Sequence, residues 1–185
     1  MSSSKIKLFY ILLLTVVIPF ENKINFESGS SISYLGYHVL HSWIGTSSNF
    51  DSRIICNDDS LNECTLEIAV PLSTFDSGNS TRDSNMLLMM KSGQYPLVFF
   101  KSEKFDISIS LKDDFIIKGE LSFNGFKKQI MTKVYLRNEG NFIRGNSTFR
   151  INLTDFEVER PQLLFIPMSD EVEINVELIF KDTLE

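Results

Sequence analysis

The sequence has few metal-binding side chains and no run of positive charge. It contains two His and two Cys among 185 residues, too few for a four-ligand Cys/His zinc site or an iron–sulfur cluster. Its 18 Lys and Arg are scattered and outnumbered by 24 Asp and Glu, so the formal net charge is −6. Binding to a phosphate backbone requires a basic patch. We therefore expect no metal, no cofactor and no nucleic acid partner.

The motifs of common enzyme classes are also absent. The sequence has no G-x-S-x-G nucleophile turn, no phosphate-binding loop and no dinucleotide-binding fingerprint. Its carboxylates fall in expected turns or on the solvent faces of expected strands, where solubility explains them better than acid–base chemistry does. His38 and His41 stand three residues apart in one expected strand, which would put them on opposite faces and prevent them from sharing a metal ion. We expect a protein that is not an enzyme.

The first twenty residues have the layout of an export signal. Lys5 and Lys7 precede an unbroken apolar run from Leu8 to Ile18. Eleven residues make a helix of roughly 16 Å, about half the thickness of a hydrocarbon core. We predict a signal peptide over 1–20, a single domain over 21–185 and a periplasmic or secreted location. Because no pair of small residues follows the run, retention as a membrane anchor is an alternative, and a buried N-terminal helix or strand is another.

The rest of the chain is dominated by a period of two. Apolar and polar residues alternate from Ile32 onward, and Asn124-Gly125 is a strong signal for a tight hairpin. One face of the final strand is apolar and the other mostly acidic, which is typical of an antiparallel sheet with one wet side. Alternation alone allows either a sandwich or a barrel. Eight strands are predicted, over Ser31–Leu40, Asn49–Cys56, Thr65–Val70, Leu97–Phe105, Phe115–Phe123, Gln129–Arg137, Asn141–Leu153 and Val172–Phe180.

One segment is predicted to be helical. Ser80 and Thr81 are good N-cap residues, and the stretch Arg82–Lys91 is followed by Gly93, which is typical just beyond a helix. The three methionines of this stretch fall on one face, where we expect them to pack on the sheet or close the end of a barrel.

The two cysteines flank a short polar loop. Cys56 and Cys64 enclose the stretch NDDSLNE, with strand-like residues on both sides. In an exported chain we predict a disulfide here, and two free thiols are the alternative. Closing a loop of about nine residues would stabilise the fold by roughly 2–3 kcal/mol.

Several stretches together resemble a known family. They are similar, in consistent order, to the signature segments of the YceI-like polyisoprenoid-binding family. These stretches are Asp76–Met86 (DSGNSTRDSNM), Tyr95–Ser102 (YPLVFFKS), Gly119–Lys128 (GELSFNGFKK), Phe149–Phe156 and Asp170–Ile174. Asn124 stands where the family has His, Leu153 where an Arg is common, and Glu157 where a Gly is common.

The resemblance implies an eight-stranded antiparallel lipocalin-like barrel with one short helix. It also implies a binder, near a membrane, for a long apolar lipid such as an isoprenoid quinone or prenyl carrier. Transferred position by position, the inward ligand-binding set is Val98, Phe100, Leu121, Phe123, Phe149, Ile151, Ile174 and Val176, all of which would serve equally well as plain core.

Arg82 is a further candidate, for a ligand head group. The N–H donors of its guanidinium would bind a phosphate or a quinone oxygen. The alternative is that the Arg82-Asp83 pair fixes the loop, and the favourable position of the Asp83 carboxylate in the helix dipole supports this alternative.

A second class of function remains open at this point. The rival is an envelope stress or adhesion module with a barrel filled by its own side chains, acting through protein contacts. The stretch Glu159–Pro167 is unusually apolar for a loop and is interpreted as a barrel mouth or a partner surface, with packing under the barrel end as the alternative.

Overall fold

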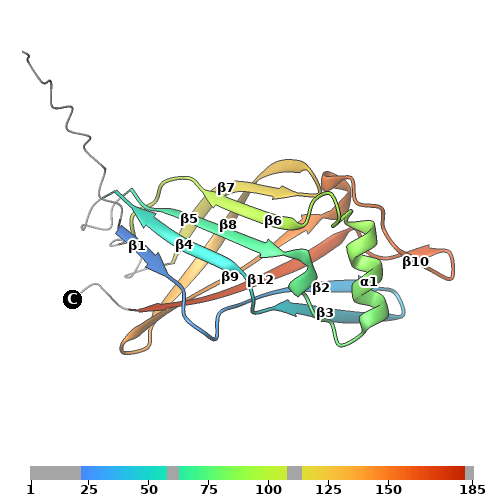
Figure 1. Ribbon diagram of the computed structural model, residues 1–185, viewed down its shortest axis with the longest axis horizontal. Coiled ribbons are helices and arrows are strands. Elements are labelled where there is room, and N and C mark those ends of the chain that lie inside the picture. Colours follow the sequence, from blue (N-terminus) through green and yellow to red (C-terminus); the bar gives the residue numbers. More distant parts are fainter. Residues whose placement is uncertain (1–21, 58–62, 108–113, 182–185) are drawn as a thin grey trace, which may run out of the picture.

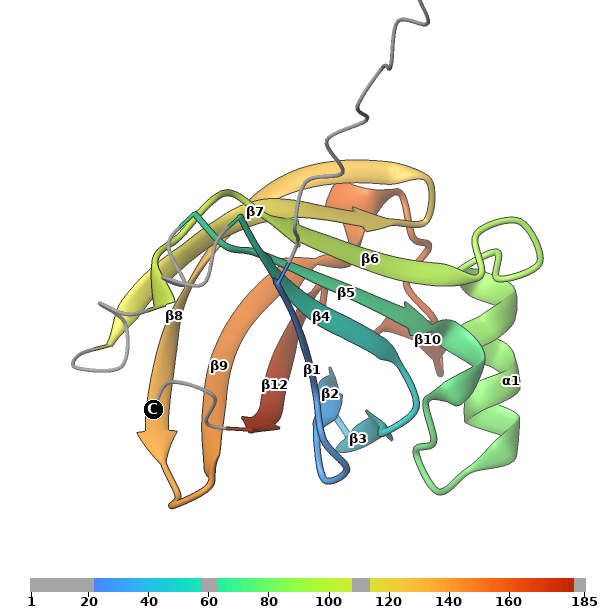
Figure 2. The same cartoon turned by 60° about the vertical axis from the view of Figure 1, so that its left-hand side comes forward.

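The computed structural model describes residues 22–57, 63–107 and 114–181. These residues form one strongly curled antiparallel sheet with a single α-helix at one end (Figure 1, Figure 2). The predicted signal segment, 1–20, lies outside the described residues. The described part of the chain contains no helix with the length and hydropathy of a membrane span.

The main sheet has ten strands in the order β1-β4-β5-β6-β7-β8-β9-β12-β2-β3. A separate hairpin consists of β10 and β11. The all-β class, the antiparallel pairing and the short helix α1 (Ser80–Met89) are confirmed. All eight predicted strands are present. The strands of the main sheet are β1 (Asn22–Asn25), β2 (Ser31–His38), β3 (His41–Ser47), β4 (Asp51–Cys56), β5 (Thr65–Pro71), β6 (Leu97–Ser102), β7 (Phe115–Phe123), β8 (Phe126–Asn138), β9 (Phe142–Asn152) and β12 (Glu171–Lys181). The small hairpin has β10 (Gln162–Leu163) and β11 (Ile166–Pro167), and two 3-10 turns span Leu72–Thr74 and Leu153–Phe156.

Two strands of the main sheet were not predicted. These are β1 and β3. The expected strand Ser31–Leu40 ends at His38, and a second strand starts at His41, so the prediction that His38 and His41 share one strand was wrong. His38 and His41 therefore face each other across a tight hairpin, with ring centroids 5.9 Å apart, and do not lie on opposite faces of one strand. Among the described residues, no group of three or more His, Cys, Asp or Glu side chains is placed to hold a metal ion.

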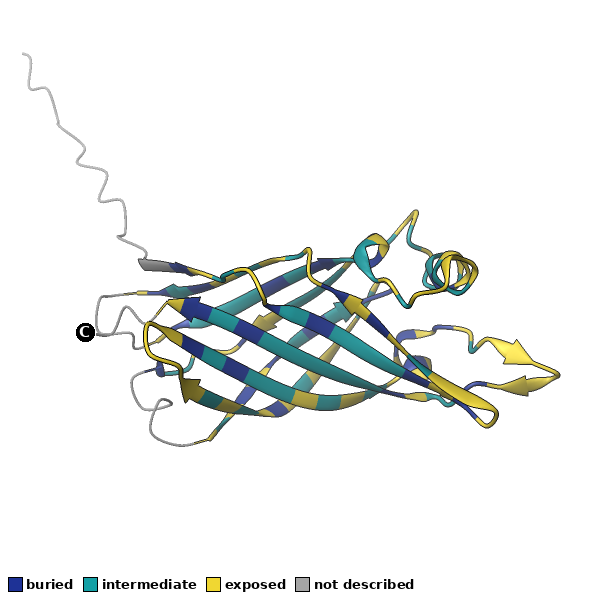
Figure 3. Ribbon diagram, turned by 90° about the horizontal axis from the view of Figure 1, so that it is seen from below, coloured by how far each residue is buried: buried dark blue, intermediate teal, exposed yellow. Residues whose placement is uncertain are grey.

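Side chains alternate between the interior and solvent along the strands (Figure 3). On β7 the buried positions are every second residue, including Ile117, Leu121 and Phe123. The seam between the two edges of the sheet is partly closed: Phe26 bridges Phe180 of β12, and at the other end the backbone of Thr46 exchanges two hydrogen bonds with Asp76. The curled sheet therefore encloses an apolar interior.

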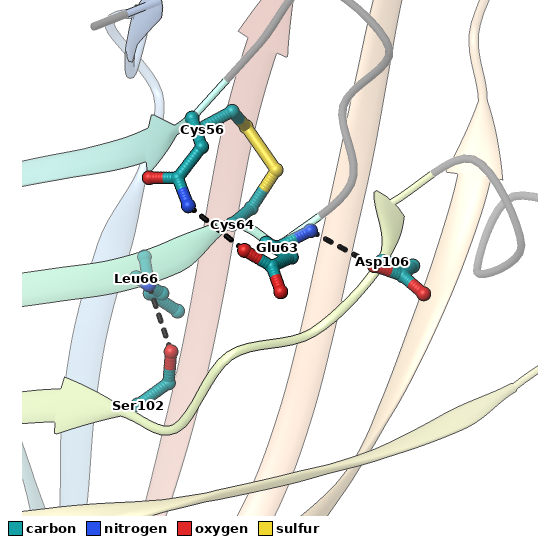
Figure 4. Close-up of a disulfide and its surroundings, with 7 residues drawn as sticks. Cys56, Glu63, Cys64, Leu66, Ser102 and Asp106 are labelled. Atoms are coloured by element: carbon teal, nitrogen blue, oxygen red, sulfur yellow. Dashed lines mark hydrogen bonds between the residues drawn. A yellow bond between two sulfur atoms is a disulfide. The ribbon is translucent and has the colours of Figure 1, made fainter. Parts of the chain in front are cut away.

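A disulfide between Cys56 and Cys64, both fully buried, lies at one end of the curled sheet (Figure 4). The backbone of Cys64 exchanges two hydrogen bonds with Phe105, of 2.8 and 2.9 Å, and Leu66 N–H donates to Ser102 Oγ at 2.8 Å. The cysteines pack in a cluster with Ile107 and Phe180. Helix α1 and the β10–β11 hairpin lie at the opposite end (Figure 1).

Candidate functional site

The interior of the curled sheet is not filled by side chains. A cavity of about 130 Å³ lies toward the disulfide end, walled almost wholly by apolar side chains such as Phe105, Phe115 and Phe180. Two of its few polar groups, the hydroxyls of Thr132 and Ser147, hydrogen-bond to each other at 2.7 Å. Because these two hydroxyls hydrogen-bond to each other, they need no polar partner on a ligand, and this end of the interior favours a hydrocarbon chain.

A larger cavity of about 510 Å³ lies toward the α1 end. Met86, Met89 and Met90 line it, which confirms that the methionine face of the helix covers the end of the barrel. Methionine side chains are flexible and adapt to irregular apolar partners. The two cavities adjoin, because six residues line both of them: Ile32, Val70, Val98, Leu121, Phe149 and Ile174.

The structure brings the residues named from sequence together around this space. Val98, Leu121, Phe149 and Ile174 line both cavities. Phe100 and Val176 line the smaller cavity alone, and Phe123, Ile151 and Arg82 line the larger cavity alone.

A loop network supports Arg82 at the mouth of the larger cavity. Its Nε donates to Ser77 Oγ at 2.9 Å and a terminal nitrogen donates to the Ser77 carbonyl at 2.7 Å. Asp83 accepts from the Ser77 hydroxyl and backbone N–H, and Asn79 caps the helix by accepting from the Arg82 N–H at 3.0 Å. The N-cap is thus Asn79, not the expected Ser80 or Thr81. These contacts account for the Arg-Asp pair by fixing the loop between β5 and α1.

We expect this loop to loosen in two variants that remove parts of the network. Asp83→Asn deprives Ser77 of a charged acceptor and lowers the stabilising charge at the helix N-terminus, which predicts a loss of about 1–2 kcal/mol. Arg82→Gln removes both bonds to Ser77 and predicts a loss of similar size. Thermal and urea unfolding measure both effects, and retained lipid is assayed in parallel. An Arg82→Gln protein of unchanged stability that retains no lipid would show instead that Arg82 binds the head group.

Sequence reasoning missed the aromatic wall that β2 and β3 contribute. Tyr34 and Trp43 line the larger cavity, and each lies across a glycine of the neighbouring strand: Tyr34 over Gly45 and Trp43 over Gly36. A Cβ at either glycine would overlap the ring, so the two glycines let the aromatic side chains lie flat on the sheet. The guanidinium of Arg82 sits 5.5 Å from the Trp43 ring centroid, in cation–π range. The signal available in the sequence was a glycine two residues after each aromatic, Gly36 after Tyr34 and Gly45 after Trp43, which puts an aromatic and a glycine on the same face of each strand.

Tyr34 contributes an uncharged polar group to the larger cavity. Burial raises the pKa of Tyr34, and the nearby carboxylate of Asp83 raises it further. The phenol is therefore neutral at ordinary pH and offers a ligand an oxygen that both donates and accepts. The site as a whole suits a long apolar molecule with a small polar end near Tyr34 and Arg82.

Two departures from the family signature have local explanations. Glu157 adopts a left-handed conformation, with φ of 51°, at the end of the turn Leu153–Phe156, a position where glycine is unstrained. Asn124 occupies the first position of the tight β7–β8 turn, with φ of 49°, and its side-chain amide donates to the Phe156 carbonyl at 2.8 Å. Asn124 therefore joins this hairpin to the turn after β9, away from the cavity wall.

Comparisons with known proteins agree with this geometry. A family model described as the YceI-like domain matches residues 23–180. The crystal structure of Burkholderia cenocepacia BcnA superposes with a TM-score of 0.71 at 16% identity, covering 84% of this chain and 99% of that one. A polyisoprenoid-binding domain from Saccharophagus degradans, implicated in plant cell wall breakdown, gives 0.67 at 11% identity, covering 86% and 97%. A Campylobacter jejuni YceI protein gives 0.57 at 16% identity, covering 99% of both chains. None of the curated proteins matches the chain. At these identities the solved structures establish a shared fold.

Proposed function

The chain belongs to the YceI-like domain family, and from this premise we propose that it carries a long-chain polyisoprenoid, a quinone or a prenyl carrier, inside its curled sheet. The observation that carries the proposal is the pair of adjoining apolar cavities, of about 510 and 130 Å³. The larger one alone falls within the range of roughly 300–1,000 Å³ that is usual for small-molecule sites. The S. degradans neighbour is a polyisoprenoid-binding domain with the same fold.

The ligand enters this site tail first. The smaller cavity is walled by apolar side chains, so a water molecule inside it would find few hydrogen-bond partners. Polar side chains that reach the larger cavity include Tyr34, Asn85 and Arg82. A ligand whose prenyl tail occupies the smaller cavity therefore has its polar end beside these groups. The protein acts as a binder, and no catalytic step is assigned to it.

Two features support a place for this binder outside the cytoplasm. The buried Cys56–Cys64 bridge is a feature of proteins from oxidising compartments. The apolar run near the N-terminus is of the right length for an export signal. An exported lipid carrier, periplasmic or secreted, combines these features with the apolar cavity.

The rival function, an adhesion or stress module, needs a barrel filled by its own side chains. The two cavities argue against it, since a well-packed core leaves few voids larger than one water molecule.

Extraction of the purified protein tests the proposal. Protein made in a host with its own prenyl lipids is washed, extracted with organic solvent and analysed by mass spectrometry. We expect a prenyl species in near-stoichiometric amount, because an apolar tunnel is more stable when filled. Extracts that contain only fatty-acyl lipids would contradict the isoprenoid assignment, and repeated extracts without any lipid would contradict the binding function.

A further inference from the structure

The β10–β11 hairpin carries apolar side chains that the fold does not use. Leu163, Leu164, Phe165 and Ile166 follow one another at its tip, with Leu164 72% and Phe165 96% exposed. None of the four belongs to a hydrophobic cluster of the core in the described part of the chain. The alternative interpretation, in which this stretch packs under the barrel end, therefore does not hold for Leu164 and Phe165. Figure 3 shows the hairpin standing clear of the sheet.

The backbone of this tip is strained by the residues it carries. Leu164 and Phe165 have φ angles of 52° and 65°, in the left-handed region. A two-residue hairpin turn of this kind normally uses Asn-Gly, which tolerates positive φ, whereas bulky side chains there cost free energy. Two large apolar residues in such a turn, with no contact to the core, point to a role for the side chains outside the molecule.

The hairpin lies at the mouth of the larger cavity. Leu163 lines that cavity and also stands on the exposed hairpin. A second apolar tip lies beside it, because His38 Nε2 hydrogen-bonds to the Ile166 carbonyl at 3.0 Å and Ser169 N–H donates to the Tyr37 carbonyl at 2.8 Å. That second tip, the turn between β2 and β3, consists of Val39 and Leu40, which are 61% and 59% exposed. We call the six residues of both tips the apolar rim: Val39, Leu40, Leu163, Leu164, Phe165 and Ile166.

We propose that the apolar rim inserts into a lipid surface, so that the cavity mouth opens onto the bilayer. This inference rests on the proposed function. Insertion carries no charge penalty at the rim itself, because no rim residue is ionisable. Leu164 and Phe165 are 72% and 96% exposed at the end of a narrow hairpin of two two-residue strands. They therefore form a small projecting apolar tip, which suits insertion into a fluid hydrocarbon phase better than docking on a flat protein surface. A prenyl lipid then passes between membrane and cavity without its tail crossing water.

The docking is apolar and not electrostatic. The chain has a formal net charge of −6, so anionic lipids do not attract it. Insertion of Leu, Phe and Ile side chains at the headgroup boundary supplies the attraction instead. Anionic lipid added to the vesicles is therefore expected to leave docking unchanged or weaker.

A tryptophan placed on the rim tests the proposal. Full-length Phe165→Trp and the matched control Ile116→Trp, on the outer face of β7 and 59% exposed, are each mixed with phosphatidylcholine vesicles whose acyl chains are brominated. We expect the bromines to quench the fluorescence of the indole introduced at position 165, and we expect vesicle binding to shift its emission to the blue. The native Trp43 contributes the same background fluorescence to both variants. The indole introduced at position 116 should be unaffected. Both variants share the same N-terminal segment, so a difference between them reports the rim.

A second pair of variants measures the consequence for transfer. Leu164→Ser/Phe165→Ser is expected to slow uptake of a prenyl lipid from vesicles by at least about tenfold and leave the amount bound at equilibrium unchanged. Ile116→Ser/Met131→Ser, at positions 59% and 62% exposed on β7 and β8, is expected to match the unmodified protein.

The outcomes separate this inference from the proposed function. Equal quenching at positions 165 and 116, in protein that binds prenyl lipid, would overturn the rim proposal and leave the function standing. A blue-shifted, concentration-dependent emission from position 165 without vesicles would assign the rim to a second copy of the chain and overturn the proposal. Quenching at position 165 in protein that binds no lipid would support membrane docking and contradict the carrier function.

Discussion

Ile174→Trp is expected to reduce the prenyl lipid that remains with the purified protein by at least about tenfold, a change of about 1.4 kcal/mol in binding free energy. Ile174 is the fourth residue of β12 and lines both cavities, so its side chain lies where they adjoin. It is only half-buried although it points inward, because it faces the cavity. An indole at this position occupies the space through which a long tail would pass from the larger cavity into the smaller one.

The same variant should fold normally. The added ring enters space that is free in the structure, so that overpacking of the kind that destabilises filled cores is limited. Ile116→Trp, on the solvent face of β7, serves as the matched control and should retain lipid at the unmodified level. Quantitative mass spectrometry of extracts, paired with thermal unfolding, measures the effect. An Ile174→Trp protein that folds normally and still carries a full complement of prenyl lipid would place the ligand outside the joined cavities.

Reduction of the Cys56–Cys64 bridge is expected to lower the free energy of unfolding by about 2–3 kcal/mol and the melting temperature by roughly 4–12 °C. The bridge spans a sequence separation of only 8, so its entropic contribution to the unfolded chain is moderate. The end of the barrel should stay folded after reduction, because Cys64 also pairs with Phe105 through two backbone hydrogen bonds.

Chemical unfolding with and without reductant measures this loss, and Cys56→Ala/Cys64→Ala is the matched variant. Alanine avoids burying an unpaired hydroxyl, since both cysteine positions are fully buried. Reductant should leave the free energy of unfolding of the double variant unchanged. Thiol titration of denatured, non-reduced protein that finds two free thiols would contradict the disulfide in solution.

Much of the cavity wall could be predicted from sequence because strand alternation is a local property. Residues two apart on a strand share a face, so the alternation along β7 agrees with the inward placement of Leu121 and Phe123 that the family resemblance implied. The helix was equally readable, since Met86, Met89 and Met90 fall on one face at helical spacing. The family resemblance then supplied the barrel, which alternation alone left undecided between barrel and sandwich.

The strand that runs from His41 to Ser47 escaped prediction for a physical reason. The turn before it, Val39-Leu40, contains none of the Gly, Asn, Asp or Pro that mark a reversal, and Val39 favours strands. The apolar β10–β11 hairpin hid its turn in the same way, at Leu164-Phe165. Both tips break the local rules of turn chemistry, and both belong to the apolar rim. Such a conflict between local preference and fold is expected where function sets the residues.

By itself the sequence determined the class of fold, the inward faces of the strands, the helix and the pairing of two cysteines across a short loop, because each depends on neighbours along the chain. Only the tertiary structure decided that the inward side chains line two adjoining cavities, since the volume left inside a curled sheet depends on how strands distant in sequence pack together. The tertiary structure alone also placed Tyr34 and Trp43 on glycines of the partner strand and brought the two apolar tips to one mouth. These arrangements follow from cross-strand register and from contacts between β2 and the segment after β11, which no local pattern encodes.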